Sequence, residues 1–228
     1  MKRWTTLAET TLPGTDQTMV LAERDGTRVI RVGGRELMSS RHSHSEQELA
    51  RIACKGLRTK PDVEVLIGGL GLGLTLREAL AVLGSDATVH VAELVGAVVQ
   101  WHRDPATGLA DISKHAVDDP RTRIIDGDVA DVLTKARGGQ FHAIMLDADN
   151  GTTAMCSPGN ASLYERDGIA AVRRALRPDG TAVWWSAQAE PRFADRVGRA
   201  GFKVTCELVR GHADGGPRHT LVVARPIG

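Results

Sequence analysis

Cysteine is scarce in this chain, and its few cysteines form no recognisable pattern. The 228 residues include only Cys54, Cys156 and Cys206, without a Cys-x-x-Cys pair or a Cys/His spacing. An odd number of scattered thiols excludes a disulfide-stabilised scaffold and gives no indication of a zinc site. We therefore expect buried or free thiols in a reducing environment, which makes the cytoplasm the expected location.

Long hydrophobic runs and an excess of either charge are also missing. No apolar run approaches the roughly 20 residues that span a membrane. The first residues, MKRWTTLAETTLPG, contain no hydrophobic signal-peptide segment. The 29 basic and 28 acidic residues leave a formal net charge of +1. Because this charge attracts neither nucleic acid nor an anionic membrane, we expect neither as a partner.

The N-terminal part of the chain is typical of a small antiparallel sheet. Short β-like runs are separated by Asp25-Gly26 and Gly33-Gly34, which are hairpin turn signals. These runs are MVLAE, TRVIRV and RELMSS. A helical pattern, HSEQELARIACKGL, follows them and leads to Pro61. Residues 1–55 are therefore expected to form a small β-meander with a linking helix, and residues 61–228 a second domain.

Beyond Pro61 the chain alternates between strand-like and helix-like segments, which indicates an α/β sheet with helices on both faces. The strand candidates are VEVLIGG, ATVHVAEL, TRIIDGD, FHAIMLDA and TAVWWSA, and the helical segments include LREALAVLG, VADVLTKA and IAAVRRALRPDG. The last two runs, KVTCELVR and HTLVVARP, are joined by a loop too short for a parallel crossover. This pattern predicts a Rossmann-like, doubly wound, seven-stranded sheet with a C-terminal antiparallel hairpin. Such a hairpin is characteristic of class I AdoMet-dependent transferases, such as methyltransferases.

A glycine-rich loop follows the first of these strands. Gly68, Gly69, Gly71 and Gly73 lie before a helical segment, where missing side chains let the backbone turn tightly against a ligand. About 20 residues further on, Glu93 ends the second strand, where a carboxylate can accept hydrogen bonds from both hydroxyls of a ribose. The loop alone also occurs in dehydrogenases and in structural α/β proteins. Together with Glu93 it predicts a nucleoside site.

Two more strands end in acidic residues. Asp128 follows the third strand and Asp147 the fourth, and ligands of open α/β sheets bind beyond these carboxyl ends. Asp128 could accept a hydrogen bond from an adenine amino group, or it could cap the following helix. Asp147 is expected near the reactive carbon of the cofactor, where it could contact the cofactor and also take a proton from an amine or orient a cationic nucleophile. Asp149 could share that catalytic role or stabilise the adjoining loop.

These segments resemble the spermidine/spermine synthase family, the polyamine aminopropyltransferases. The resemblance extends from about Gln17 to the helix before Gly180, and it is carried by DQTMVLAERDGTRVI, SEQEL, LIGGLGLGLTLRE, VAEL, DPRTRIIDGD, IMLDADN and ALRPDG. It implies that Gln17 contacts the nucleoside, Glu93 the ribose and Asp128 the adenine. It also implies that Asp147 accepts the proton of an attacking amine, and that the chain forms a homodimer through its N-terminal sheet.

The departures from the family pattern fall on the acceptor side of the expected site. Leu72 stands where the family's glycine loop has an aspartate, and Glu46 stands where a helix has a tyrosine. In the family that aspartate faces the ammonium of decarboxylated AdoMet and would repel the carboxylate of intact AdoMet. We therefore predict an AdoMet-dependent methyltransferase that acts on a small non-polyamine acceptor. The alternative is an aminopropyltransferase that uses decarboxylated AdoMet and a diamine.

Several residues near the expected acceptor side have more than one interpretation. His42 and His44 could bind an acidic or phenolic substrate or act as a base, but two histidines without a third ligand predict no metal site. The serines beside Glu46 could cap the helix. Trp185 could contact the acceptor or pack in the core. An NAD-linked oxidoreductase and a non-catalytic nucleoside-binding module are further alternatives. The candidate substrate-binding residues are His44, Glu46, Leu72 and Trp185.

Overall fold

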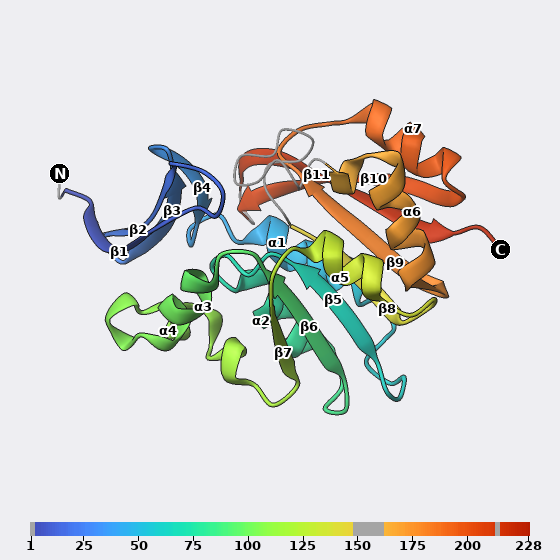
Figure 1. Cartoon of the computed structure of the whole chain (residues 1–228), viewed down its shortest axis with the longest axis horizontal. Coiled ribbons are helices and arrows are strands. Elements are labelled where there is room, and N and C mark those ends of the chain that lie inside the picture. The colour runs from blue at the N-terminus through green and yellow to red at the C-terminus, as the bar shows by residue number, and fades with distance from the viewer. Residues whose placement is uncertain (1–2, 148–161, 213–214) are drawn as a thin grey trace.

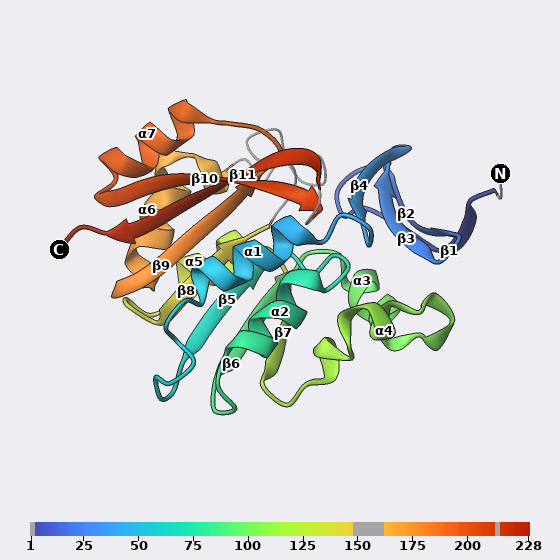
Figure 2. The same cartoon turned by 180° about the vertical axis from the view of Figure 1, so that it is seen from behind.

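The computed structural model describes residues 3–147, 162–212 and 215–228, and it contains two sheets (Figures 1 and 2). A four-stranded N-terminal sheet lies beside a larger α/β unit, and helix α1 (His44–Ala53) follows the small sheet along the chain. This mixed architecture, with a separate antiparallel sheet, confirms the predicted fold class.

The N-terminal sheet is a meander in which each strand pairs antiparallel with the next. Its strands are β1 (Thr5–Thr11), β2 (Thr18–Arg24), β3 (Thr27–Val32) and β4 (Arg35–Ser39). The turns form where the sequence predicts them, with Asp25, Gly26, Gly33 and Gly34 at positive φ. The sequence pattern does not predict β1, because TTLAETT has few apolar residues and none of its side chains is fully buried.

Seven strands form the larger sheet in the order β10-β11-β9-β8-β5-β6-β7. They are β5 (Glu64–Gly68), β6 (Thr88–Glu93), β7 (Thr122–Asp126), β8 (Phe141–Leu146), β9 (Leu176–Ser186), β10 (Phe202–His212) and β11 (Gly215–Pro226). The neighbouring strands from β9 to β7 in this order are parallel. Strand β11 is antiparallel to both β10 and β9, which confirms the predicted terminal hairpin.

Helices cover both faces of the larger sheet and bury two separate cores. One core contains side chains from α1, α2 (Leu74–Val82), α3 (Gly96–Arg103) and the N-terminal sheet. The other contains side chains from α5 (Val129–Lys135), α6 (Arg166–Ala175) and α7 (Pro191–Arg199). Figure 2 shows α1 and α2 together on the near face. Because Leu21 and Ile30 of the small sheet share a core with Leu49 of α1, the meander packs directly on the α/β unit.

The segment ALRPDG belongs mostly to a strand and not to the preceding helix. Helix α6 ends at Ala175 and β9 begins at Leu176, so the expected helical continuation to Gly180 is wrong. Pro178 explains the early end, because a proline disfavours helical conformation at the residue before it and cannot donate a helical hydrogen bond.

None of the helices within residues 3–147, 162–212 and 215–228 is long and apolar enough to cross a lipid bilayer.

Candidate functional site

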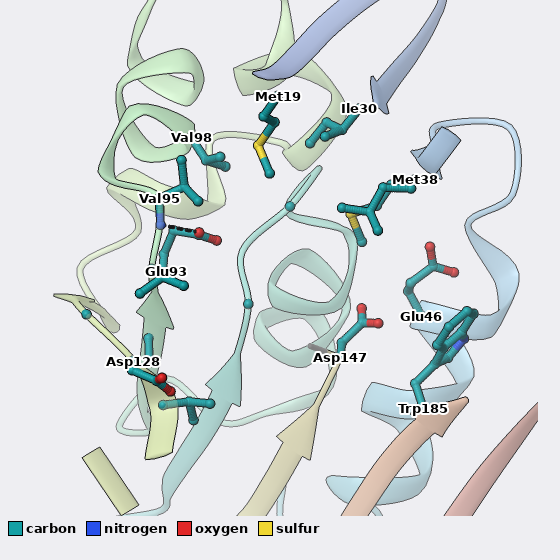
Figure 3. A pocket seen from close by; sticks show the side chains of 17 residues that line it. Met19, Ile30, Met38, Glu46, Glu93, Val95, Val98, Asp128, Asp147 and Trp185 are labelled. Atoms are coloured by element: carbon teal, nitrogen blue, oxygen red, sulfur yellow. Dashed lines mark hydrogen bonds between the residues drawn. The ribbon is translucent and has the colours of Figure 1, made fainter. Parts of the chain in front are cut away.

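One cavity lies between the carboxyl ends of strands β5, β6 and β8 and the N-terminal sheet (Figure 3). About 860 Å³ of empty space lies between its walls, a volume that includes the part open to solvent. Four carboxylates line it, those of Glu46, Glu93, Asp128 and Asp147. The other described lining residues are uncharged: Met19, Ile30, Leu37, Met38, Gly69, Gly71, Ala92, Leu94, Val95, Val98, Gly127, Val129 and Trp185.

In the glycine loop, the glycines at 69 and 71 form the cavity wall with their backbone. Gly69 and Gly71 have φ angles of +96° and +50°, in the left-handed region that favours glycine, and both line the cavity. A Cβ atom on Gly71 would overlap the Met38 sulfur, and one on Gly69 would lie 3.0 Å from the carbonyl oxygen of Asp147. Larger residues would therefore displace the neighbouring walls of the cavity.

The leucines of the same loop anchor it in the core. Leu70, Leu72 and Leu74 are 4%, 0% and 3% exposed, and all three belong to the core shared with α1 and α2. Leu72 is not among the residues that line the cavity. The Leu72 side chain points into the core. The loop faces the cavity with its backbone, and not with every second side chain as a strand would. The structure therefore does not support the predicted contact between Leu72 and a substrate.

Glu93, at the end of β6, ties the glycine loop to the turn that precedes α3. Its Oε2 accepts a hydrogen bond from the backbone N–H of Leu70 at 2.8 Å, and its Oε1 accepts one from Val95 at 2.8 Å. The side chain is 7% exposed and lines the cavity. The two backbone donors fix the carboxylate, and each oxygen can accept a further hydrogen bond. The ribose contact remains a prediction that this geometry permits.

Asp128 caps a helix and also lines the cavity. Its Oδ1 accepts a hydrogen bond from the backbone N–H of Ala130 at 2.8 Å, so the N-cap of α5 is formed as one of the two sequence interpretations expects. Its place in the cavity wall leaves the adenine contact open as a second role.

Asp147 follows β8 directly, and its contacts connect it to the residues on either side of the glycine loop. Thr75 on α2 donates a hydrogen bond from Oγ1 to Oδ2 of Asp147 at 3.1 Å. The backbone N–H of Asp147 donates to the carbonyl of Gly68 at 3.2 Å. The position of this carboxylate therefore depends on the path of the loop. Asp149, the other predicted catalytic residue, lies outside the described residues.

Glu46 and Trp185 line the cavity beyond Asp147 (Figure 3). Glu46 is only 6% exposed, and the hydroxyl of Ser45 donates a hydrogen bond to its Oε2 at 2.6 Å. Burial raises the pKa of Glu46, and the hydrogen bond from Ser45 opposes this shift. Within the described part of the chain, no lysine or arginine pairs with it. A buried carboxylate that faces a cavity without such a partner suits a cationic ligand.

Other predicted residues lie outside the cavity lining. Gln17 is exposed in the turn before β2, and His44 begins α1. Gly68 ends β5 in the core, and Gly73 is the N-cap of α2. Helix capping, one of the two interpretations of the serines, is not seen at the N-cap of α1, where Ser43 makes no side-chain capping hydrogen bond.

Histidine rings pack behind the Trp185 side of the cavity. The His42 ring lies 4.3 Å from that of His212, and the His219 ring lies 4.8 Å from that of Trp185. Burial lowers the pKa of both His42 and His219. None of these histidines lines the cavity. No cluster of three or more His, Cys, Asp or Glu residues in the described ranges is arranged to hold a metal ion.

The N-terminal sheet supplies one wall of the cavity that sequence reasoning missed. Met19, Ile30, Leu37 and Met38 come from this sheet and contribute only apolar surface. Their alternation in short strands indicates a buried face, but nothing in their spacing connects them to the glycine loop. Only the packing of the two sheets reveals that these residues belong to the site.

The sequence is similar to curated polyamine aminopropyltransferases, although no protein-family model matches it. It is 33% identical over 141 residues to polyamine aminopropyltransferase 1 of Streptomyces coelicolor, a match that covers 60% of this chain and 24% of that protein. It is 34% identical over 121 residues to polyamine aminopropyltransferase 1 of Hyperthermus butylicus, covering 52% of this chain and 39% of the relative. The matched part of the chain thus spans less than half the length of these relatives.

Solved structures of spermidine synthase share the fold. The enzyme from Thermotoga maritima superimposes with a TM-score of 0.72 and 20% identity, covering 96% of this chain and 71% of the other. A spermidine synthase in complex with the transition-state analogue AdoDATO gives a TM-score of 0.71, with the same identity and coverage. The chain is thus similar in sequence to polyamine aminopropyltransferases and in fold to spermidine synthase.

Proposed function

We propose that the chain transfers an aminopropyl group from decarboxylated AdoMet to an amine. The observation that carries this proposal is the charge of the cavity, which has four carboxylates and no basic side chain among its described lining residues. Such a site attracts ligands with several positive charges and disfavours anions. The names of the curated relatives support the same reaction class.

The charge of the cavity also distinguishes the two candidate donors. Decarboxylated AdoMet carries a sulfonium and an ammonium group, whereas intact AdoMet carries an additional carboxylate. That carboxylate would need a basic side chain or free backbone donors, and the charged side chains of the described lining are all acidic. The cavity therefore favours decarboxylated AdoMet.

Methyl transfer from intact AdoMet, the reaction that the glycine loop suggested, loses its main support. That interpretation depended on Leu72 facing the donor in place of an aspartate. Leu72 is instead fully buried in the core and does not line the cavity. The curated relatives are also named for aminopropyl transfer. We therefore favour the aminopropyltransferase alternative, with a diamine as the acceptor.

The nucleoside part of the donor would bind at the ends of β5 and β6. We expect Glu93 to accept hydrogen bonds from the two ribose hydroxyls and Asp128 to accept one from the adenine amino group. Val95 and Val98 line the same region and would supply apolar contacts to the adenine ring. Gly69 and Gly71 let the backbone approach the donor closely.

Asp147 is the proton acceptor in this proposal. The donor supplies an electrophilic carbon because its sulfur is positively charged. The acceptor nitrogen is an ammonium at neutral pH and has no lone pair until it loses a proton, which Asp147 can take and release to solvent. When the freed amine nitrogen bonds to that carbon, the carbon–sulfur bond breaks and its electron pair stays on sulfur. Thr75 holds the carboxylate in place for this transfer.

Detection of the products tests the proposed reaction directly. The purified chain is incubated with decarboxylated AdoMet and putrescine, and the mixture is analysed by mass spectrometry. We expect methylthioadenosine and the aminopropylated amine in equal amounts. A methylated amine formed from intact AdoMet, with no product from decarboxylated AdoMet, would contradict the proposal and support methyl transfer.

Replacing Glu93 with glutamine should weaken binding of methylthioadenosine about 30-fold. The neutral amide loses charge-assisted hydrogen bonds to the ribose, and its NH2 group cannot accept one of the two backbone N–H bonds that Glu93 receives from Leu70 and Val95. Isothermal titration calorimetry measures this affinity. Asp126→Asn is a matched control, because Asp126 pairs with Glu93 across β6 and β7 but does not line the cavity. Equal losses in the two variants would show that general sheet damage, and not the ribose contact, causes the effect.

Replacing Glu46 with glutamine should raise the KM for a diamine about tenfold and leave the KM for a monoamine of similar length almost unchanged. The physical reason is that a second ammonium group would lie against the Glu46 carboxylate and the Trp185 ring. The hydrogen bond from Ser45 can persist in the variant, because the glutamine carbonyl also accepts. Steady-state kinetics with both amines give the comparison.

The matched control for this variant is Glu48→Gln, on the same helix. Glu48 pairs with Arg51 at 2.7 Å and does not line the cavity. Its replacement should leave both KM values unchanged. A Glu46→Gln variant that discriminates between diamine and monoamine as the wild type does would argue against Glu46 as the ammonium site.

A further inference from the structure

His102 is a buried histidine that contacts the glycine loop from behind. It lies near the end of α3 and is 1% exposed. Its Nε2 lies 3.0 Å from the carbonyl oxygen of Gly71, and its Nδ1 lies 3.3 Å from Oγ of Ser113 in helix α4 (Leu109–Ser113). The residue does not line the cavity, but Gly71 does.

The partners of the ring determine its protonation. A carbonyl oxygen only accepts hydrogen bonds, so Nε2 must carry a hydrogen and donate to Gly71. Burial lowers the pKa of His102, which favours the neutral ring, although the bond to Gly71 opposes the shift. The Ser113 hydroxyl lies 3.3 Å from Nδ1 and also donates to the carbonyl oxygen of Ala110 at 3.3 Å, and its single hydrogen serves one of them at a time. The contact with a fixed direction is therefore the hydrogen bond from Nε2 to Gly71.

The glycine at position 73 is explained by the same ring. Gly73 has a φ of +72°, and a Cβ atom there would lie 2.8 Å from both Cε1 of His102 and Cβ of Ser113. The imidazole therefore packs against the backbone of Gly73 while it hydrogen-bonds to Gly71. One side chain thus contacts the loop at two positions, Gly71 and Gly73.

This contact reaches the proposed catalytic group through the backbone. Gly73 is the N-cap of α2, and Thr75 in the first turn of that helix donates a hydrogen bond to Asp147. A shift of the loop would therefore move the backbone at Gly71 and the hydroxyl that holds Asp147. An apolar residue could fill the volume of His102 but could not donate to the Gly71 carbonyl.

We propose that His102 is a positioning residue of the active site, which fixes the glycine loop for the adenosyl donor and for Asp147. The proposal builds on the proposed function, because it assigns the loop to donor binding. Its physical content is one hydrogen bond from Nε2 of His102 to the backbone carbonyl of Gly71.

Two replacements at His102 separate positioning from packing. Leucine removes the donor, whereas glutamine keeps an N–H that can reach the Gly71 carbonyl. We expect His102→Leu to weaken methylthioadenosine binding about tenfold, and His102→Gln to recover most of this loss. Ser113→Ala should give a smaller loss, because it removes a contact of the ring but leaves the donor to Gly71 in place. Calorimetry at a temperature far below the unfolding midpoint measures the affinity of methylthioadenosine for the wild type and for each of these three variants.

His142→Leu is the matched control. His142 is also buried, and its Nδ1 accepts a hydrogen bond from the backbone N–H of Glu64 at 3.1 Å. It lies near the start of β8, at the other end of the strand from Asp147. We expect this variant to lose thermal stability without losing affinity for methylthioadenosine.

Hydrogen exchange of the loop gives a readout that needs no ligand. Backbone amides of residues 69–75 should exchange faster in His102→Leu than in the wild type, and His102→Gln should restore their protection. Unchanged exchange would overturn the proposal. If both variants fold and the leucine and glutamine replacements weaken methylthioadenosine binding equally, the proposal is also overturned. If the wild type binds no adenosyl ligand while exchange responds as expected, the proposed function fails and the role of His102 in holding the loop stands.

Discussion

Replacing Asp147 with asparagine should lower kcat for aminopropyl transfer about 10³-fold, because asparagine cannot accept the proton of the attacking amine. The replacement is nearly isosteric, and the asparagine carbonyl can still accept the hydrogen bond from Thr75. Affinity for methylthioadenosine should stay within about twofold, since Asp147 acts at the acceptor side. Single-turnover kinetics and calorimetry measure the two quantities separately.

The experiment is informative because it measures kcat and the affinity for methylthioadenosine separately. A large loss of nucleoside affinity would mean that Asp147 binds the donor. An unchanged kcat would mean that the proton leaves by another path, and the assignment of Asp147 would then be wrong. Thr75→Val should give a smaller kcat loss, about tenfold, because it removes only the group that orients the carboxylate.

Replacing Leu72 with aspartate should destabilise the fold by about 4 kcal/mol, because it buries an unpaired carboxylate and removes core packing. Leu72 is fully buried among the apolar side chains of the core shared with α1 and α2. Urea denaturation gives the free energy of unfolding. Leu72→Met, which conserves volume, should cost less than about 1.5 kcal/mol and provides the control.

The outcome of this replacement also bears on donor selection. If Leu72→Asp folded with nearly wild-type stability and weakened AdoMet relative to decarboxylated AdoMet, Leu72 would have to face the donor. The buried placement of Leu72 predicts the reverse, which is a strong loss of stability with no specific change in donor preference.

The fold could be predicted from the sequence because its signals are local. The turns at Asp25-Gly26 and Gly33-Gly34 predict the meander, and the short connection before β11 predicts the antiparallel hairpin. The end of α6 is harder to predict. The helical periodicity continues past Ala175 into residues that belong to β9, and only Pro178 indicates the boundary. Periodicity alone does not reveal where a proline ends a helix.

The site could be predicted only in part. Glu93, Asp128 and Asp147 stand at strand ends, so the topology of a parallel sheet brings them to one edge. The direction of Leu72 could not be read from the motif, because a loop of left-handed glycines does not alternate its side chains as a strand does. His102 could not be found either, since its contact with Gly71 depends on how α3 packs behind the loop.

Donor selection is the central claim, and calorimetry with decarboxylated AdoMet and intact AdoMet tests it most directly. Both ligands share the adenosyl sulfonium, so the comparison isolates the carboxylate. The acidic cavity predicts that decarboxylated AdoMet binds at least about tenfold more tightly than AdoMet. Tighter binding of intact AdoMet would contradict the account and restore methyl transfer as the better interpretation.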